Sequence, residues 1–400
     1  MNILFDLYTT QHFIGGGAEY IRKVFYSVLD AIDGKNDVKL FGLHSSKLNK
    51  YAYADLNPDA MIAKGVTPVD AANSSLKRII TEYQIDKVFI GVAQYWGKAF
   101  DVQNIKVPCI CVIHDLCMED YEDSQVPELL NLPWGWYLFN RKRLGWHKRR
   151  ILGQWKDPLL QMKNIMEMAH SNDNVQFITV SDYSLRSFQY HFDYPIERVK
   201  VLYSCPRVNL VREGVEDSVL KEVISSGKKY YLMLSANRDL KNPKHTFNAF
   251  RRFVECGHKD AFLLTTGCKE RMFDNHIPLG YICDNDLVLA MKHCYALLFP
   301  SFMEGFGYPP IEAMEYGKPV LCSNVTSIPE ICGDAAIYFS PLYESDIFRC
   351  LHILNDSNYD EYAEKSRKRY LEVNKRQHED LKTLVRLILK RFDRPIIEVI

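Results

Sequence analysis

Short apolar runs alternate along this chain with longer segments whose apolar positions recur every three or four residues. Short runs rich in Val, Ile, Phe and Tyr are typical of buried strands, and their alternation with helical segments is typical of β-α-β units on a parallel sheet. The runs that predict strands are 3–7, 38–43, 87–92, 109–114, 177–181, 199–203, 230–234, 262–266, 296–300, 319–322 and 336–339. The pattern therefore predicts the α/β class.

Two segments show the helical period clearly. Apolar residues at 21, 24, 25, 28, 29 and 32, and again at 381, 384, 385, 388, 389 and 392, would each line one face of a helix. A polar stretch, 207–229, separates the two series of strands. We therefore expect two doubly wound domains with a cleft between them, residues 1–206 and 207–377, which bind ligands beyond the carboxyl ends of their strands.

Composition and charge remove several classes of protein. Of the 400 residues, 47% are apolar and 25% charged, an ordinary globular balance. Lys plus Arg equals Asp plus Glu at 50 each, so we expect no nucleic-acid partner. The eleven cysteines form no C-x-x-C pair, which disfavours a zinc or redox motif. Without a basic leader or an apolar run of about 18 residues, the sequence predicts a cytoplasmic protein.

The densest candidate site is the segment 299–314, FPSFMEGFGYPPIEAM. A strand runs into a glycine-containing loop and then into a helix expected to start at Pro309 or Pro310, where proline is favoured. Glycines let backbone amides approach a ligand, and a helix N-terminus favours an anion. Glu304 lies in the loop and Glu312 is expected in the first helical turn. The helix dipole alone would explain Glu312, but it does not explain Glu304 beside two glycines.

Residues 279–336 resemble the family-4 retaining glycosyltransferases of the GT-B fold. The residues that carry the resemblance are the segment 299–314 together with Leu279-Gly280-Tyr281, Pro329-Glu330 and Gly333-Asp334-Ala335-Ala336. The resemblance implies two facing Rossmann-like domains, the first on the acceptor side and the second binding the nucleotide sugar, with the final helix, 378–400, packing back on the first. Glu304 would hold donor-sugar hydroxyls and the developing positive charge, and Glu312 the ribose hydroxyls. The amides of Gly305, Phe306 and Gly307 would face the donor phosphate or sugar, and Tyr281 and Ile282 would also bind the donor.

Further candidates follow other predicted strands. Arg238 and Lys241 would supply the fixed positive charge that a diphosphate needs. The family often has an adjacent Arg-Lys pair, whereas Leu240 precedes Lys241 here, so which cation meets which phosphate stays open. An exposed basic pair on a loop is the alternative.

The first domain adds two candidates. Gly16 and Gly17 resemble the family's Gly-Gly loop, which faces the donor phosphates and the acceptor. A dinucleotide fingerprint fails, because its third glycine would fall at Tyr20. His114 ends a strand, where the family often places a histidine near the donor sugar, although a structural role is the alternative. Ser181 is expected only to cap a helix.

Two other segments have alternatives that stay open. The first is Asp284-Asn285-Asp286, a pattern that would hold a divalent metal in a different glycosyltransferase fold. We favour helix capping for these residues, and we expect neither a metal nor another cofactor. A carboxylate at this place would also suit a guanine base. Residues 134–150, which include Trp146, Arg149 and Arg150, combine aromatic and basic side chains suited to a membrane surface or a lipid-linked anionic acceptor. A solvated basic helix face is the alternative.

The sequence thus predicts a retaining, metal-independent transfer of a hexose from a nucleotide-diphosphate sugar to a hydroxyl of a glycan or lipid-linked glycan. Gly307-Tyr308-Pro309-Pro310 resembles bacterial mannosyl- and rhamnosyltransferases of surface polysaccharide and lipopolysaccharide assembly. That favours mannose and a GDP-sugar, with UDP- and dTDP-sugars next, and a place at the inner face of the cell membrane. The alternatives are a sugar-nucleotide epimerase of the same fold and an inactive nucleotide-sugar-binding partner.

Overall fold

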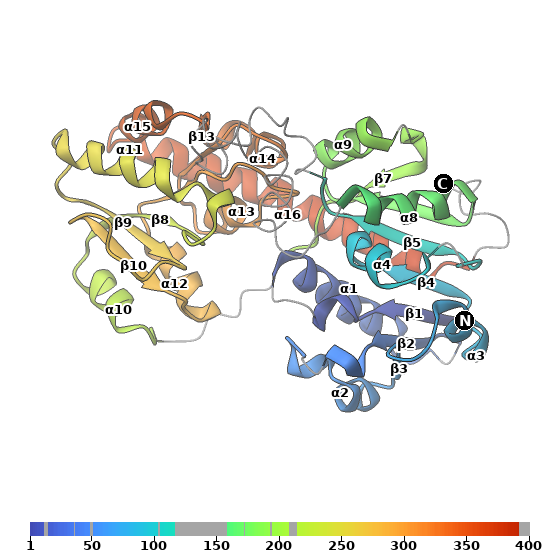
Figure 1. The fold of residues 1–400 in the computed structure, drawn as a ribbon. Helices are drawn as coiled ribbons and strands as arrows, with labels where there is room; N and C mark the ends of the chain where they lie inside the picture. Colours follow the sequence, from blue (N-terminus) through green and yellow to red (C-terminus); the bar gives the residue numbers. More distant parts are fainter. Residues whose placement is uncertain are drawn as a thin grey trace, which may run out of the picture. The chain divides into compact units, whose positions relative to one another are not determined.

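The structure is a computed structural model that describes residues 1–11, 15–35, 37–48, 51–102, 105–116, 158–171, 173–192, 194–207 and 214–391. These residues form two compact units, each built on its own sheet (Figure 1). The first unit contains the described residues up to 207 and those from Arg376 onward. The second contains the described residues between Gly214 and Lys375.

The first unit is a seven-stranded sheet in the order β3-β2-β1-β4-β5-β6-β7, and every neighbouring pair is parallel. Its strands are β1 (Asn2–Asp6), β2 (Lys39–His44), β3 (Thr67–Asp70), β4 (Lys87–Ile90), β5 (Cys109–Ile113), β6 (Val175–Thr179) and β7 (Val199–Val201). The order reverses between β1 and β4, as in doubly wound sheets, whose ligands bind at such a point beyond the strand ends.

Helices cover both faces of this first sheet. α1 (Gly16–Ile32) and α2 (Pro58–Ala63) lie on one face, where the Phe25 ring packs 5.4 Å from that of Phe5. The opposite face carries α3 (Leu76–Glu82), α4 (Ala93–Ala99), α8 (Pro158–Ser171) and α9 (Asp182–Phe192). Trp96 of α4 and Phe188 of α9 are fully buried there, in one core with alternate residues of the strands.

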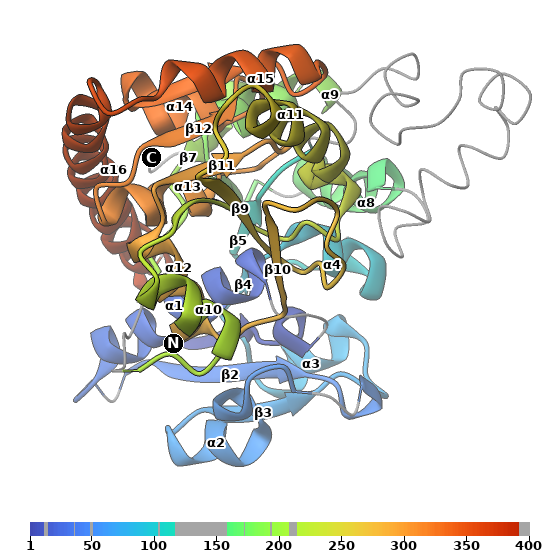
Figure 2. The ribbon, with the colours of Figure 1, turned by 90° about the vertical axis from the view of Figure 1, so that its left-hand side faces the viewer.

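The second unit is a six-stranded sheet in the order β10-β9-β8-β11-β12-β13, again parallel at every pair. Its strands are β8 (Lys229–Met233), β9 (Ala261–Thr266), β10 (His276–Gly280), β11 (Ala296–Phe299), β12 (Val320–Ser323) and β13 (Ala336–Phe339). α11 (Pro243–Glu255) and α15 (Glu344–Ile353) lie side by side over one core (Figures 1 and 2). The remaining helices are α10 (Ser218–Ser225), α12 (Asp284–His293), α13 (Tyr308–Glu315) and α14 (Ile328–Cys332).

Two strands escape prediction from the sequence, and both lie at a sheet edge. β3 has one buried residue, Val69, and includes Pro68; β10 includes Pro278. An edge strand tolerates proline, and neither strand carries a continuous apolar run, because β3 has exposed polar residues and β10 is interrupted by His276 and Pro278. The predicted α/β class and the eleven predicted strands are confirmed, with bounds that shift by one or two residues.

The long helix α16 (Tyr359–Leu389) begins in the second unit and ends in the first. Within the first unit, Asp380 Oδ2 accepts a hydrogen bond of 2.8 Å from Tyr203 N, and Gln377 Nε2 donates one of 2.6 Å to Ser204 O. Lys87, buried in β4, donates to the carbonyls of Leu387 and Ile388 at 3.1 and 3.0 Å. Among the described residues, no helix has both the length and the apolar character that crossing a bilayer requires.

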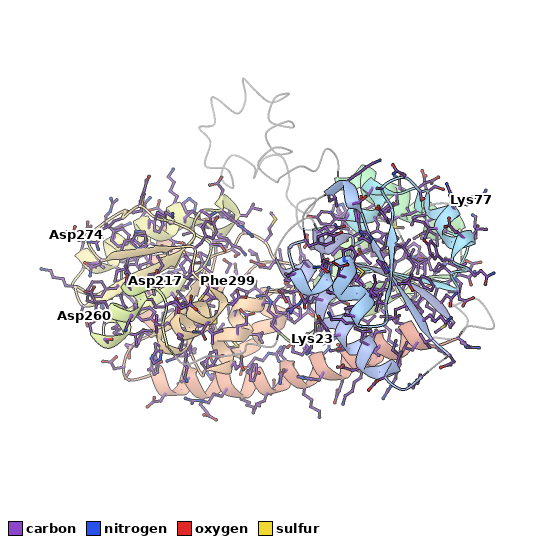
Figure 3. All side chains as sticks on the ribbon, turned by 90° about the horizontal axis from the view of Figure 1, so that it is seen from below. Lys23, Lys77, Asp217, Asp260, Asp274 and Phe299 are labelled. Atoms are coloured by element: carbon purple, nitrogen blue, oxygen red, sulfur yellow. The ribbon has the colours of Figure 1, made fainter. Side chains whose placement is uncertain are left out.

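Parallel strands place all their carboxyl ends at one edge of each sheet. In the second unit, Asp260 and Asp274 precede β9 and β10, and they lie at the opposite end of the unit from Phe299, which ends β11 (Figure 3). The loops that carry the predicted donor-site residues all leave the edge to which Phe299 belongs.

Candidate active site

An ion pair between two loops forms the centre of the candidate site in the second unit. Lys241 follows β8 and Glu304 follows β11, and the Lys241 ammonium contacts Glu304 Oε1. The two side chains are only 18% and 16% exposed. Lys241 Nζ also lies 5.1 Å from the centre of the Phe299 ring. The fold thus brings together an anionic and a cationic group that the sequence placed on separate segments.

Backbone contacts hold Glu304 in place. Its amide donates to Thr326 Oγ1 at 3.1 Å, and its carbonyl accepts from Ser327 Oγ at 2.9 Å. The neighbouring Phe302 amide donates to Leu240 O at 3.0 Å, which joins the loop after β11 to the loop after β8. Thr326 has a φ of +53°, a conformation that non-glycine residues adopt rarely and often at functional sites. Thr326 and Ser327 were not predicted as site residues, because a Thr-Ser pair in a loop carries no distinctive signal.

The glycine loop ends where α13 begins. Gly307 is the residue before the helix and has a φ of +94°, which favours glycine. The helix starts at Tyr308, not at Pro309 or Pro310 as predicted, because prolines fit the second and third positions of a first turn equally well. Glu312 is therefore the fifth helical residue and lies beyond the first turn. Glu312 as a residue is only 8% exposed, and the helix dipole does not explain its burial.

The other predicted donor-binding residues of the second unit, which are Gly305, Phe306, Tyr281 and Ile282, differ in how exposed they are. Phe306 is buried, with its ring 5.4 Å from that of Tyr308, whereas Gly305 is half-buried. Tyr281 is 79% exposed, and its hydroxyl accepts a 2.8 Å hydrogen bond from Asn237 Nδ2. Ile282, next to it, is half-buried.

Arg238 is exposed and precedes the short 3-10 helix Asp239–Lys241. Asn237, which was not predicted as a site residue, packs its side chain against Gly267: a Cβ there would lie 2.3 Å from Asn237 Oδ1. Asn237, Arg238 and Lys241 thus follow β8 within one short loop. The signal that could have identified Asn237 is its position, directly after a predicted strand.

The structure corrects the expectation for Asp284-Asn285-Asp286. α12 begins at Asp284, and its capping position is Cys283, which makes no side-chain hydrogen bond to the helix. Asp286 is buried and instead accepts the amides of Glu216 and Asp217 at 2.9 and 2.7 Å. This carboxylate anchors the chain just before α10, so capping of α12 does not account for it.

In the first unit, the predicted residues lie at the carboxyl edge of its sheet. Gly16 and Gly17 are the first residues of α1. His114 directly follows β5, and its Nε2 lies 3.0 Å from Gly91 O, while its ring meets that of Tyr20 edge to face at 4.8 Å. Burial lowers the pKa of His114 to about 4, so the imidazole is neutral at pH 7.

Ser181 caps α9, as predicted, by accepting the Ser184 amide at 3.1 Å. Ser184 Oγ in turn donates to His114 O at 2.9 Å, a contact that the sequence did not indicate. The predicted patch at residues 134–150, with Trp146, Arg149 and Arg150, lies outside the described residues.

Comparison with known families supports placing the candidate site in the second unit. Residues 216–366 match the family described as "Glycosyl transferases group 1". These residues contain Arg238, Lys241, Glu304 and Glu312, the charged residues of the candidate site.

Known proteins resemble the chain over different extents. The O-antigen chain mannosyltransferase B of Escherichia coli is 31% identical over 179 residues, which cover 41% of this chain and 47% of that protein. The chain therefore matches less than half the length of this relative.

Solved structures cover nearly all of the chain. The Anabaena protein Alr3699/HepE, crystallised with UDP and glucose, gives a TM-score of 0.60 at 14% identity over 96% of this chain and 100% of that one. WaaG, a glycosyltransferase involved in lipopolysaccharide biosynthesis, gives 0.57 at 16% identity over 97% and 100%. At these identities the likeness shows the fold, and the predicted GT-B class is confirmed.

Proposed function

Because residues 216–366 match the group 1 glycosyltransferases, we propose that this chain transfers a hexose from a nucleotide-diphosphate sugar to a hydroxyl of a glycan or lipid-linked glycan. Configuration at the anomeric carbon would be retained. We assign the donor to the second unit, residues 207–377 in the predicted division, and the acceptor side to residues 1–206, with the final helix, 378–400, on the same side.

The observation that carries this proposal is the contact between Lys241 and Glu304 at the carboxyl edge of the second sheet. A glycosyl donor presents a negative diphosphate next to a sugar that becomes positive as the bond breaks. A cation and a carboxylate in contact, both largely buried, offer one partner to each part of that donor. Glu304 would face the sugar and Lys241, with Arg238, the diphosphate.

The charge that develops on the leaving diphosphate is the main electrostatic demand of the reaction. Lys241, Arg238 and the amides of Gly305, Phe306 and Gly307 would stabilise it, and we assign this task to them without a metal ion. Glu312 would bind the ribose. The departing phosphate oxygen would take the proton of the acceptor hydroxyl, so that no protein nucleophile is needed. In the first unit, we propose His114, Gly16 and Gly17 as further residues that act on the donor.

The donor is proposed to be GDP-mannose, with UDP- and dTDP-sugars as the alternatives. The name of the Escherichia coli relative supports mannose, and the Tyr308-Pro309-Pro310 sequence supports the same group of enzymes. Tyr281 and Ile282 would meet the base. The proposed acceptor belongs to bacterial polysaccharide or lipopolysaccharide biosynthesis, and residues 134–150 would contact the membrane that carries it.

The first test is a thermal-shift panel with GDP, UDP, dTDP and ADP at equal concentration. A ligand at a hundred times its Kd stabilises the folded state by about 2.7 kcal/mol, so the base of the donor should stand out. We expect the largest shift with GDP. A shift with a different nucleotide would change the donor, and no shift with any of them would overturn the proposed donor site.

The second test incubates the matching nucleotide sugar with and without mannosylated acceptors and follows the anomeric configuration by NMR. We expect an α-linked product from an α-linked donor, formed only with acceptor. A converted sugar nucleotide without acceptor would replace transfer by epimerisation.

A further inference from the structure

Asp6 is a fully buried carboxylate at the end of β1, in the first unit. Its Oδ1 accepts the Thr9 amide at 3.0 Å, and its Oδ2 accepts Thr9 Oγ1 at 2.8 Å and the Gly91 amide at 3.0 Å. These donors are neutral, and so is the indole of Trp96, whose interaction with Asp6 lowers the pKa of this carboxyl. Burying a carboxylate among neutral donors is costly, and burial raises the pKa of Asp6. Both oxygens accept hydrogen bonds, as the oxygens of a carboxylate do.

Gly91 connects this carboxylate to His114. The Gly91 amide donates to Asp6, and the Gly91 carbonyl lies 3.0 Å from His114 Nε2. A carbonyl can only accept, so Nε2 carries the proton, and in the neutral ring Nδ1 keeps its lone pair. No other residue fits at position 91, because a Cβ there would lie 2.3 Å from Cγ1 of Ile21 in α1.

Other contacts fix the backbone and the ring of His114. Ser184 Oγ donates to its carbonyl at 2.9 Å, and the Tyr20 ring meets the imidazole at an interplanar angle of 89°. The direction of the ring therefore depends on where the Gly91 carbonyl stands. That position is set by the hydrogen bond from Gly91 to Asp6.

We propose that Asp6 is a positioning residue for His114: through Gly91 it fixes the imidazole as the Nε2–H tautomer and presents Nδ1 as a hydrogen-bond acceptor. The group that Nδ1 recognises is a hydroxyl donor, and a sugar hydroxyl is the class that matches. This last step rests on the proposed function, whereas the tautomer and its dependence on Asp6 do not.

Asp6→Asn is the variant that tests the coupling. The amide of asparagine has one oxygen, so its NH₂ must face either the Thr9 amide or the Gly91 amide, donor against donor. The matched control is Asp70→Asn. Asp70 also ends a strand of the first unit and accepts the amides of Ser46 and Ala72 at 2.9 Å, without contact to Gly91.

The first readout is the pair of His114 ring-nitrogen shifts in ¹⁵N-histidine-labelled protein at pH 7, assigned by their loss in His114→Gln. We expect a protonated Nε2 and an unprotonated Nδ1 in the wild-type protein and in Asp70→Asn, and a mixture of tautomers in Asp6→Asn. The opposite tautomer in the wild-type protein, or unchanged shifts in Asp6→Asn, would overturn the proposal. If Asp6→Asn does not fold, Thr9→Val loosens the same carboxylate and should change the shifts in the same direction.

The second readout is a double-mutant cycle on transferase activity. We expect Asp6→Asn to lower kcat/KM about tenfold or more, as for loss of orientation, but to have no further effect in a His114→Ala background. Additive losses would show a merely structural Asp6 and would overturn the proposal. A protein without transferase activity would refute the proposed function, while the nitrogen shifts would still test the coupling.

Discussion

Glu304 and Lys241 meet although 63 residues separate them along the chain. Each side chain neutralises the charge of the other in a largely buried place. A charged ligand can therefore bind either side chain only if the ion pair between them opens. If Glu304 stabilises charge in the transition state, Glu304→Gln should lower kcat about a hundredfold. The Kd of the nucleoside diphosphate should change by less than about threefold, because the nucleotide is held by other groups.

Steady-state kinetics and calorimetric nucleotide titration of the same samples separate the two effects. Glu255→Gln is the control, since Glu255 is an exposed glutamate at the end of α11, outside the site. An unchanged kcat in Glu304→Gln would remove its assigned role.

His276, buried in β10, is a residue whose tautomer the structure decides. Its Nδ1 accepts the Met272 amide at 3.0 Å, and its Nε2 bonds Thr265 Oγ1 at 2.9 Å. Protonation would turn Nδ1 into a donor that faces another donor. Burial, with the nearby Arg271, lowers the pKa of His276 to about 4.

The folded pKa lies below the ordinary value of 6.5, so the unfolded chain binds more protons between pH 6.5 and 4. The free energy of unfolding should therefore fall by a few kcal/mol as the pH drops through that window, with a further contribution from His114. His276→Asn keeps an acceptor for Met272 but has no titrating ring. Urea unfolding at several pH values should show a shallower pH dependence for this variant; an equal slope would contradict the prediction.

At the scale of elements, hydrogen bonds from Lys87 hold the C-terminal end of α16. A lysine with 1% exposure donates to carbonyls of the last turn, which have no partner within the helix. Burial lowers the pKa of Lys87 to about 7. Lys87→Met should leave these carbonyls unsatisfied and destabilise the protein by about 3 kcal/mol.

Amide hydrogen exchange should locate the effect of Lys87→Met in the last turns of α16. Lys39→Met, at the exposed first position of β2, is the matched control and should change stability little. Equal exchange in the two variants would show that Lys87 does not hold the helix end.

Glycine is needed before α13 because of its backbone conformation, and not because a side chain at position 307 would lack room. A Cβ on Gly307 would meet only Ile328 Cγ1, at 4.0 Å, yet its φ is +94°. Gly307→Ala should therefore lower the free energy of unfolding by about 1–2 kcal/mol through strain, and Gly307→Asn by less, since asparagine tolerates positive φ. Chemical denaturation of both variants measures the difference; equal losses would point to packing instead.

For the whole molecule, one continuous helix belongs to both units. α16 crosses from the second to the first at Lys375–Arg376, where Lys375 is exposed. A proline there removes a helical hydrogen bond at a cost of about 3 kcal/mol. We expect calorimetry of Lys375→Pro to show two separated unfolding transitions, whereas Lys375→Ala should unfold as the wild type does. A single transition in the proline variant would show that α16 does not couple the units.

The sequence by itself determined the α/β class, eleven of the thirteen strands among the described residues, and the motif of residues 299–314 that matches the group 1 glycosyltransferases, because buried strands and a dense local motif are written in consecutive residues. The edge strands β3 and β10 carry no such run, since polar residues and a proline interrupt each of them. Only the tertiary structure decided that Lys241 pairs with Glu304, that Asp286 anchors the chain before α10, and that Asp6 and His114 share Gly91. These contacts join segments distant in sequence, and their partners come together only when the sheet and the helices on it have packed.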